Sequence, residues 1–127
     1  LGLKRSIRYV GYISHNEKIE LLKGALAFTF PTLYEGFGLP VLEALALGVP
    51  VITSTTSSLP EIAGKAALLV DPSNVQAIAR AMKDVATKTT TSERLQKAGP
   101  KQASQFSWDT CALETMKVYR KAAGKKK

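Results

Sequence analysis

The chain has 127 residues, enough for one domain of ordinary size, and 45% of them are hydrophobic and 22% charged, as is typical of a soluble globular protein. No apolar run approaches the roughly 20 residues that cross a bilayer, and the first ten residues lack the apolar stretch and cleavage site of a signal peptide. The single cysteine, Cys111, excludes an internal disulfide, and with only one histidine, His15, a Cys/His metal site is not expected. We therefore expect a cytoplasmic protein that holds no metal.

The net charge of +8 is concentrated in the last third of the chain. Residues 80–127 carry twelve Lys or Arg and four Asp or Glu, whereas residues 1–79 sum to zero. Such a segment fits an anionic membrane surface, which would place the protein at the inner membrane face. It also fits a solvated helical face, which is the commoner case. Nucleic acid is not an expected partner, because the only aromatic residues of this third, Phe106, Trp108 and Tyr119, are at positions expected to pack their helices.

Along the chain, apolar runs alternate with helical patterns, which predicts an α/β fold. Strands are predicted at Ile7–Val10, Ala27–Pro31, Val51–Thr53 and Ala67–Val70. Helices are predicted at His15–Ala25, between Pro40 and Gly48, and at Val75–Thr87, Glu93–Gln105 and Trp108–Ala122. The middle strands are apolar without alternation, as in a strand that helices cover on both faces. We expect one domain over residues 1–127, with a parallel sheet of about four strands.

The most informative stretch is the loop Glu35–Leu39, which leads from a predicted strand into the helix that begins at Pro40. In an open α/β sheet, ligands lie at the carboxyl ends of the strands, and a helix N-terminus there attracts phosphate. Two glycines in this loop let a ligand approach the backbone closely. A turn that needs glycine for its dihedral angles explains the same residues equally well.

Two carboxylates lie near the ends of this stretch. Glu35 is the first residue of the loop, and Glu43 is predicted in the first turn of the helix. They are suited to accept hydrogen bonds from the hydroxyls of a sugar. The alternatives are a solvated loop residue for Glu35 and a favourable interaction with the helix dipole for Glu43. The loop at Ser57 and Ser58 follows a neighbouring strand and can line the same crevice, although serine-rich loops are common.

The stretch EGFGLPVLEALALGVPVITS resembles the motif of glycosyltransferase family 4, the group 1 glycosyltransferases. The segments RYVGYISHNEKIELLKGALAFTFPT, SSLPEIAGKAALLVDPSN and FSWDTCALETMKVYRKA also resemble that family, in its order, over most of residues 5–122. The resemblance implies the Rossmann-like C-terminal domain of a GT-B fold. It also implies transfer of a sugar from a nucleotide diphosphate donor, UDP- or GDP-linked, with retention of configuration and without a metal or other cofactor.

The resemblance also implies roles for individual residues. Glu43 matches the residue that binds the ribose, and Glu35 matches the catalytic residue beside the donor sugar. Tyr12 and Ile13 match the loop beside the base. Phe37, Gly38 and Leu39 match positions whose backbone N–H groups face the diphosphate and the sugar, and Gly36 belongs to the same binding loop.

The family's diphosphate-binding Arg and Lys, two strands of its sheet and its acceptor-binding N-terminal domain precede the segment that this chain matches. We therefore expect a truncated domain that is inactive by itself and whose partner is the N-terminal domain. Without the two strands, Ile7–Val10 must pair with Ala27–Phe30, pair with a second copy in a homodimer, or stay frayed. The alternative function is a non-catalytic nucleotide-binding or interaction module that retains the fold.

Overall fold

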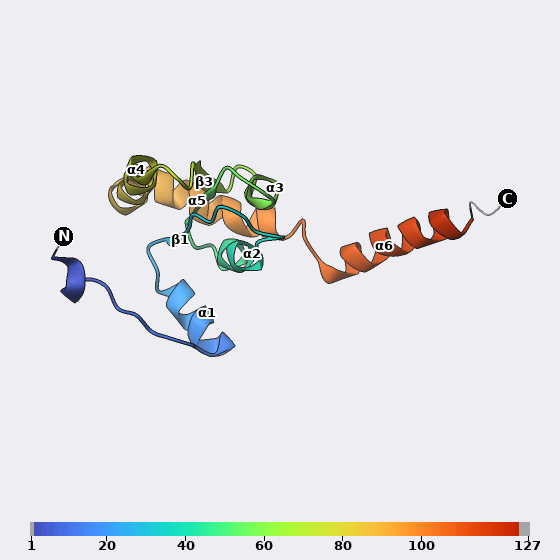
Figure 1. Cartoon of the computed structure of the whole chain (residues 1–127), viewed down its shortest axis with the longest axis horizontal. Helices are drawn as coiled ribbons and strands as arrows, with labels where there is room; N and C mark the ends of the chain where they lie inside the picture. Colours follow the sequence, from blue (N-terminus) through green and yellow to red (C-terminus); the bar gives the residue numbers. More distant parts are fainter. Residues whose placement is uncertain (1, 125–127) are drawn as a thin grey trace.

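The structure is a computed structural model that describes residues 2–124, arranged as a small three-stranded sheet with helices around it (Figure 1). A 3-10 helix, η1 (Leu3–Arg5), comes first. The remaining elements are α1 (His15–Lys23), β1 (Phe28–Phe30), α2 (Leu39–Ala46), β2 (Val51–Ser54), α3 (Leu59–Ala63), β3 (Ala67–Val70), α4 (Val75–Thr87), α5 (Thr89–Ala103) and α6 (Trp108–Ala123).

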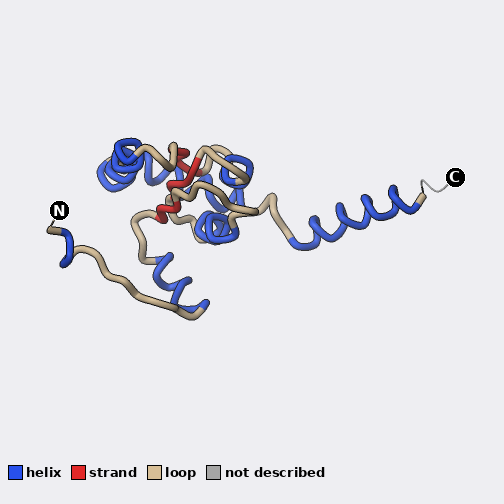
Figure 2. Tube along the Cα trace, in the orientation of Figure 1, coloured by secondary structure: helices blue, strands red, loops and turns tan. Residues whose placement is uncertain are grey.

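The three strands are parallel and lie in the order β1-β2-β3. Phe28 of β1 pairs with Val51 of β2, which in turn pairs with Ala67 of β3. The sheet lies at the centre of the main body (Figure 2). All four residues of β2 are buried, which confirms the expectation that the apolar middle strand is covered on both faces.

The prediction of a fourth strand at Ile7–Val10 is wrong. These residues belong to no strand, and Ile7 and Tyr9 are 69% and 94% exposed. A β-strand exists only through hydrogen bonds to a neighbour, and β1 pairs with β2 alone among the described residues. Within the chain this segment is unpaired and does not pair with β1, and pairing with a second copy stays a prediction.

The core lies on both faces of β2, because successive side chains of a strand point to opposite sides. Val51 belongs to a cluster with Leu45 of α2 and Ile62 of α3. Ile52 belongs to a second cluster with Val85 of α4 and Leu95 of α5. The first cluster fixes α2, and with it the loop that precedes α2, to the sheet.

Helix α5 packs closely against α2 because Gly99 lies at their contact. A Cβ at Gly99 would lie 2.7 Å from the backbone oxygen of Leu45. The sequence placed this helix at 93–105, but it begins four residues earlier and ends at Ala103, and Pro100 lies within it. Helix boundaries are set by capping and packing as much as by periodicity, which explains the shift.

Helix α6 ends one residue beyond its predicted C-terminus but does not pack on the sheet. It projects from the main body (Figure 1), and none of its residues is buried. The apolar residues Met116 and Tyr119, expected on one face, are 47% and 65% exposed. No helix in residues 2–124 is both long enough and apolar enough to cross a membrane.

Candidate functional site

The loop from Glu35 to Gly38 connects the carboxyl end of β1 to the first turn of α2, as predicted. Gly38 is the N-cap of α2 and has a φ of 104°, in the region that favours glycine. It is also buried, and a Cβ there would lie 2.8 Å from Cδ2 of Leu59. Both the dihedral angle and the close approach therefore require glycine at position 38.

Side-chain hydroxyls of the neighbouring strand hold the segment that leads into this loop. The Thr53 hydroxyl donates to the backbone oxygen of Phe30 over 3.0 Å, and the Ser54 hydroxyl donates to that of Thr32 over 2.6 Å. Both hydroxyl-bearing residues are fully buried. Buried polar groups are stable only when they are hydrogen-bonded, so these contacts fix the end of β1 against β2.

The same pattern continues into the loop itself. The Ser57 hydroxyl accepts a hydrogen bond from the N–H of Glu35 over 2.9 Å and donates one to the backbone oxygen of the same residue. The Ser58 hydroxyl lies 2.8 Å from the backbone oxygen of Phe37 and 3.0 Å from that of Glu35. The expectation that the Ser57–Ser58 loop lies beside the glycine loop is confirmed.

These contacts orient the peptide groups of the loop. Across a trans peptide unit, the carbonyl of one residue and the N–H of the next point in opposite directions. Because the carbonyls of Glu35 and Phe37 face the two serines, the N–H groups of Gly36 and Gly38 point away from them. Within residues 2–124, no group accepts a hydrogen bond from the N–H of Gly36, Phe37, Gly38 or Leu39.

This arrangement is suited to an anion. Four N–H groups without an acceptor among the described residues lie at the start of α2, where the helix dipole adds a partial positive charge. The helix has no acidic residue in its first turn and no side chain that caps its N-terminus. The N-terminus of α2 therefore has its hydrogen-bond donors available to a ligand.

Glu43 lies in the second turn of α2 rather than the first, because the helix begins at Leu39. Its proposed interaction with the helix dipole is weaker there, since that effect falls off within the first turn. Lys18 of α1 donates a hydrogen bond to Glu43 Oε1 over 2.9 Å, and its Nζ lies 2.7 Å from Oε2. Both carboxylate oxygens of Glu43 thus lie close to the ammonium group of Lys18, and Oε2 is buried.

Glu35 differs from Glu43 in having no partner for its side chain. Its backbone is held by the serines, whereas its carboxylate makes no hydrogen bond or ion pair with any residue between 2 and 124. The side chain is half-buried at the mouth of the loop. A carboxylate in this position is available to a ligand that binds at the N-terminus of α2.

Tyr12 and Ile13 lie on the arm that precedes α1. Tyr12 is 99% exposed, and no hydrogen bond between the described residues joins either of them to the Glu35–Leu39 loop. The structure thus brings together the loop, Glu35 and the serines, and it links Glu43 to α1 through Lys18. The role of Tyr12 and Ile13 beside a base stays a prediction.

Sequence reasoning missed two contributors to this region. The first is Lys18, whose contact with Glu43 carries no signal in sequence because the two residues are 25 positions apart. Phe106 packs edge-to-face on Phe37, with ring centroids 6.1 Å apart, and lines an apolar groove of about 420 Å³ with Leu39, Leu42 and Trp108. This groove lies between the first turn of α2 and the start of α6.

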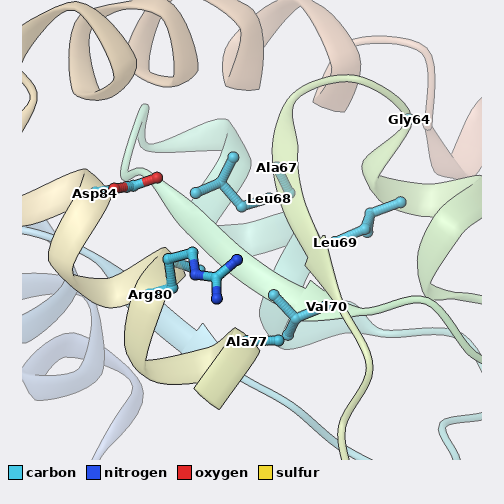
Figure 3. A pocket seen from close by; sticks show the side chains of 9 residues that line it. Gly64, Ala67, Leu68, Leu69, Val70, Ala77, Arg80 and Asp84 are labelled. Atoms are coloured by element: carbon cyan, nitrogen blue, oxygen red, sulfur yellow. The ribbon is translucent and has the colours of Figure 1, made fainter. Parts of the chain in front are cut away.

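A second groove of about 420 Å³ lies between β3 and α4 (Figure 3). Leu68 and Val70 of β3 line it on one side, and the side chains of Arg80 and Asp84 reach it from α4. None of the residues predicted to bind a ligand lines this groove. The N–H groups, the unpartnered carboxylate and the serines all gather instead at the start of α2.

This chain belongs to the group 1 glycosyltransferase family, as its sequence and fold together show. The sequence model of the family described as "Glycosyl transferases group 1" matches residues 1–102. The chain is 41% identical over 114 residues to O-antigen chain mannosyltransferase B of Escherichia coli. It is 34% identical over 126 residues to the MMP alpha-(1->4)-mannosyltransferase of Mycolicibacterium hassiacum. These alignments cover 90% and 96% of the chain.

The fold agrees with this assignment. The structure is similar to that of sucrose-phosphate synthase from Thermosynechococcus elongatus, with a TM-score of 0.83 and 30% sequence identity over 96% of the chain. The expected GT-B class of fold is confirmed, although with three strands rather than about four. The chain spans 30% and 31% of the length of the two mannosyltransferases and 31% of the synthase.

Proposed function

We propose that this chain provides the donor site of a retaining glycosyltransferase, which binds a UDP- or GDP-linked sugar for transfer to an acceptor hydroxyl. Family membership supports sugar transfer as the general activity. The single observation that supports the donor site is the set of four N–H groups, from Gly36 to Leu39, that have no acceptor within residues 2–124. A diphosphate supplies the negative charge and the acceptor oxygens that such a set lacks.

In this proposal the loop acts most strongly when the sugar leaves. Negative charge develops on the departing phosphate, and fixed N–H groups stabilise that charge without having to reorganise. The serines hold the loop in place, and the dipole of α2 adds to the stabilisation. The proposal assigns no metal and no other cofactor to this step.

The two carboxylates take separate parts of the donor. Glu43 accepts a hydrogen bond from a ribose hydroxyl through a carboxylate that also pairs with Lys18 and is about one-third exposed. Glu35 orients the donor sugar, since its carboxylate has no protein partner in the described part of the chain. The acceptor hydroxyl then attacks from the face that the phosphate leaves, so that the configuration is retained.

Other parts of the complete site lie further from the loop. Tyr12 and Ile13 are proposed to contact the base, although Tyr12 is exposed and Ile13 half-buried. The acceptor site is proposed to lie outside this chain, in an N-terminal domain, because the relatives are about three times as long. A homodimer and an anionic membrane surface stay as predictions of the sequence.

A second candidate function is a non-catalytic module that retains the fold. The Lys18–Glu43 ion pair favours it, because the pair gives Glu43 a role in joining α1 to α2 that needs no ligand. The two functions make different predictions for the loss of Glu43. In the donor site its loss weakens nucleotide binding, and in the module it changes only stability.

The test is calorimetric titration of the chain with UDP, GDP and ADP. We expect one nucleotide to bind, and Glu43→Ala to weaken its binding by about 1–3 kcal/mol, the usual range for a charge-assisted hydrogen bond. Glu20→Ala is the matched control, because Glu20 is also paired with a lysine, Lys23, on the surface of α1. Circular dichroism checks that both variants remain folded.

Each outcome separates the two functions. Binding that Glu43→Ala weakens and Glu20→Ala leaves unchanged supports the donor site. Binding that neither variant changes would remove Glu43 from the site. If the unsubstituted chain binds none of the three nucleotides, the donor-site proposal is wrong for this chain.

A further inference from the structure

We propose that Ser57 is a positioning residue for the donor loop, and that its hydroxyl fixes the direction of the N–H groups that receive the diphosphate. This inference rests on the proposed donor site and concerns a residue to which the sequence comparison assigned no role of its own. It assigns to Ser57 no contact with the ligand. Its effect passes through the backbone of Glu35.

The backbone of Ser57 is the first observation. Its φ is 60°, and it is the one non-glycine residue with a positive φ in residues 2–124. A side chain in this left-handed region costs free energy that glycine does not. Such conformations persist only where the surrounding structure holds them, and they gather at functional sites. Glycine would adopt this φ more easily but has no hydroxyl, so the hydroxyl is the feature that distinguishes serine from glycine at position 57.

The pair of hydrogen bonds with Glu35 is the second observation. The Ser57 hydroxyl accepts from the Glu35 N–H over 2.9 Å and donates to the Glu35 carbonyl, so one side chain engages both backbone groups of one residue. Glu35 lies 22 residues away in sequence and in no strand. The hydroxyl thus holds the backbone of Glu35 against the neighbouring segment, as backbone hydrogen bonds hold β1 against β2.

These bonds set the geometry of the two groups that act on the donor. Fixing the carbonyl of Glu35 fixes the plane of the peptide that it shares with Gly36, and so the direction of the Gly36 N–H. Fixing the N–H and the carbonyl together also fixes the Cα of Glu35, from which the unpartnered carboxylate extends. A loop without this support would sample orientations that do not bind the diphosphate.

The fold does not depend on Ser57. The end of β1 is held by the buried hydroxyls of Thr53 and Ser54, whereas Ser57 is exposed and its contact with Glu35 lies at the surface. The Ser58 hydroxyl lies 2.8 Å from the carbonyl of Phe37 and 3.0 Å from that of Glu35, whereas among the described residues the Glu35 N–H has its acceptor in Ser57. Loss of the Ser57 hydroxyl should therefore loosen the first part of the loop and leave the sheet intact.

The informative variant is Ser57→Gly, because it removes the hydroxyl and also relieves the unfavourable φ. A residue that served stability alone would give a less stable protein when changed. Ser57→Gly is instead expected to unfold at the same urea concentration or a higher one. Ser57→Ala, which removes the hydroxyl and keeps the unfavourable φ, is expected to be less stable than Ser57→Gly. Ser104→Ala is the matched control, because its hydroxyl also donates to a carbonyl, that of Lys101, at the end of α5.

Two measurements on the chain and these variants test the inference. Amide hydrogen exchange should be about tenfold or more faster at Glu35 in Ser57→Gly, with no change in the amides of β2, because Glu35 loses the acceptor of its N–H. Affinity for the nucleotide that the unsubstituted chain binds should fall about threefold to tenfold, the effect of one lost hydrogen bond. Ser104→Ala should change neither.

The outcomes separate this inference from the donor site itself. Faster exchange at Glu35 together with weaker binding supports the role of Ser57. Unchanged exchange, or faster exchange with unchanged affinity, overturns it while the donor site stands. If the unsubstituted chain binds none of UDP, GDP and ADP, the donor-site proposal fails and the role of Ser57 in it fails with it. The exchange experiment then shows whether the hydroxyl holds the loop at all.

Discussion

Two segments of the chain are expected to hold one nucleotide, and they are built in opposite ways. The loop Glu35–Leu39 is joined to the sheet by serine hydroxyls and continues into a helix whose Leu45 is fully buried. The arm that carries Tyr12 is exposed and belongs to no strand. In the proposed donor site, the phosphate-binding part is thus built within one strand–loop–helix unit, whereas the part beside the base lies outside that unit.

The largest expected difference between the segments is in stability. Leu45→Ala removes a fully buried side chain at the contact of α2 with α5, and we expect it to lower the free energy of unfolding by about 2–5 kcal/mol. Tyr12→Ala should change it by less than about 0.5 kcal/mol, because Tyr12 is almost wholly exposed. Urea denaturation measures both. A substantial loss of stability in Tyr12→Ala would mean that the arm packs in solution.

A smaller effect is expected within the loop, where the two glycines differ. Gly38→Ala places a Cβ at a positive φ and 2.8 Å from Leu59, so it should destabilise the chain by about 1–3 kcal/mol. A Cβ at Gly36 would meet nothing within 4 Å and has no positive φ, so Gly36→Ala should be close to neutral. Equal stabilities of the two variants in thermal unfolding would contradict the observed conformation of the loop.

The ion pair between Lys18 and Glu43 joins the helix after the arm to the helix after the loop. A double-mutant cycle with Lys18→Met and Glu43→Gln should give a coupling free energy of about 0.5–1 kcal/mol, since the two side chains are 36% and 31% exposed. The coupling should decrease in high salt. A coupling of zero would mean that the two helices are not linked through this pair.

The smallest effect is expected at the start of α1, where Ser14 and Glu17 form a capping box. Hydrogen bonds from the Ser14 side chain and then from its N–H hold the pKa of Glu17 below its ordinary value of 4.5. Because the folded pKa is the lower one, the stabilisation is present above 4.5 and is lost as the pH falls through the folded pKa. Circular dichroism should show α1 fraying in that acidic range, and Ser14→Ala should abolish the pH dependence of this step.

Much of the fold could be predicted from the sequence where local chemistry decides it. The capping box at Ser14, Pro40 in the first turn of α2 and Gly48 after its end are local signals, and each helix boundary near them is close to the predicted one. The strand at Ile7–Val10 could not be judged in this way, because an apolar run becomes a strand only beside another strand.

The candidate site likewise has contacts that the sequence predicts and contacts that it does not. The approach of Ser57 to Glu35 was expected, because both follow parallel strands whose carboxyl ends meet at one edge of the sheet. The contact of Lys18 with Glu43 depends on how α1 packs beside α2, which periodicity does not encode. The left-handed backbone of Ser57 also carries no signal in sequence, since serine does not favour that region.

The most direct test of the donor site is a map of backbone amide chemical shifts as UDP or GDP is added to the chain. The account predicts that the amides of Gly36 to Leu39 shift first and furthest, together with the Glu43 region, and that they saturate with the calorimetric affinity. Shifts confined to the groove at Arg80 between β3 and α4, or no shifts at nucleotide concentrations that saturate binding, would contradict it.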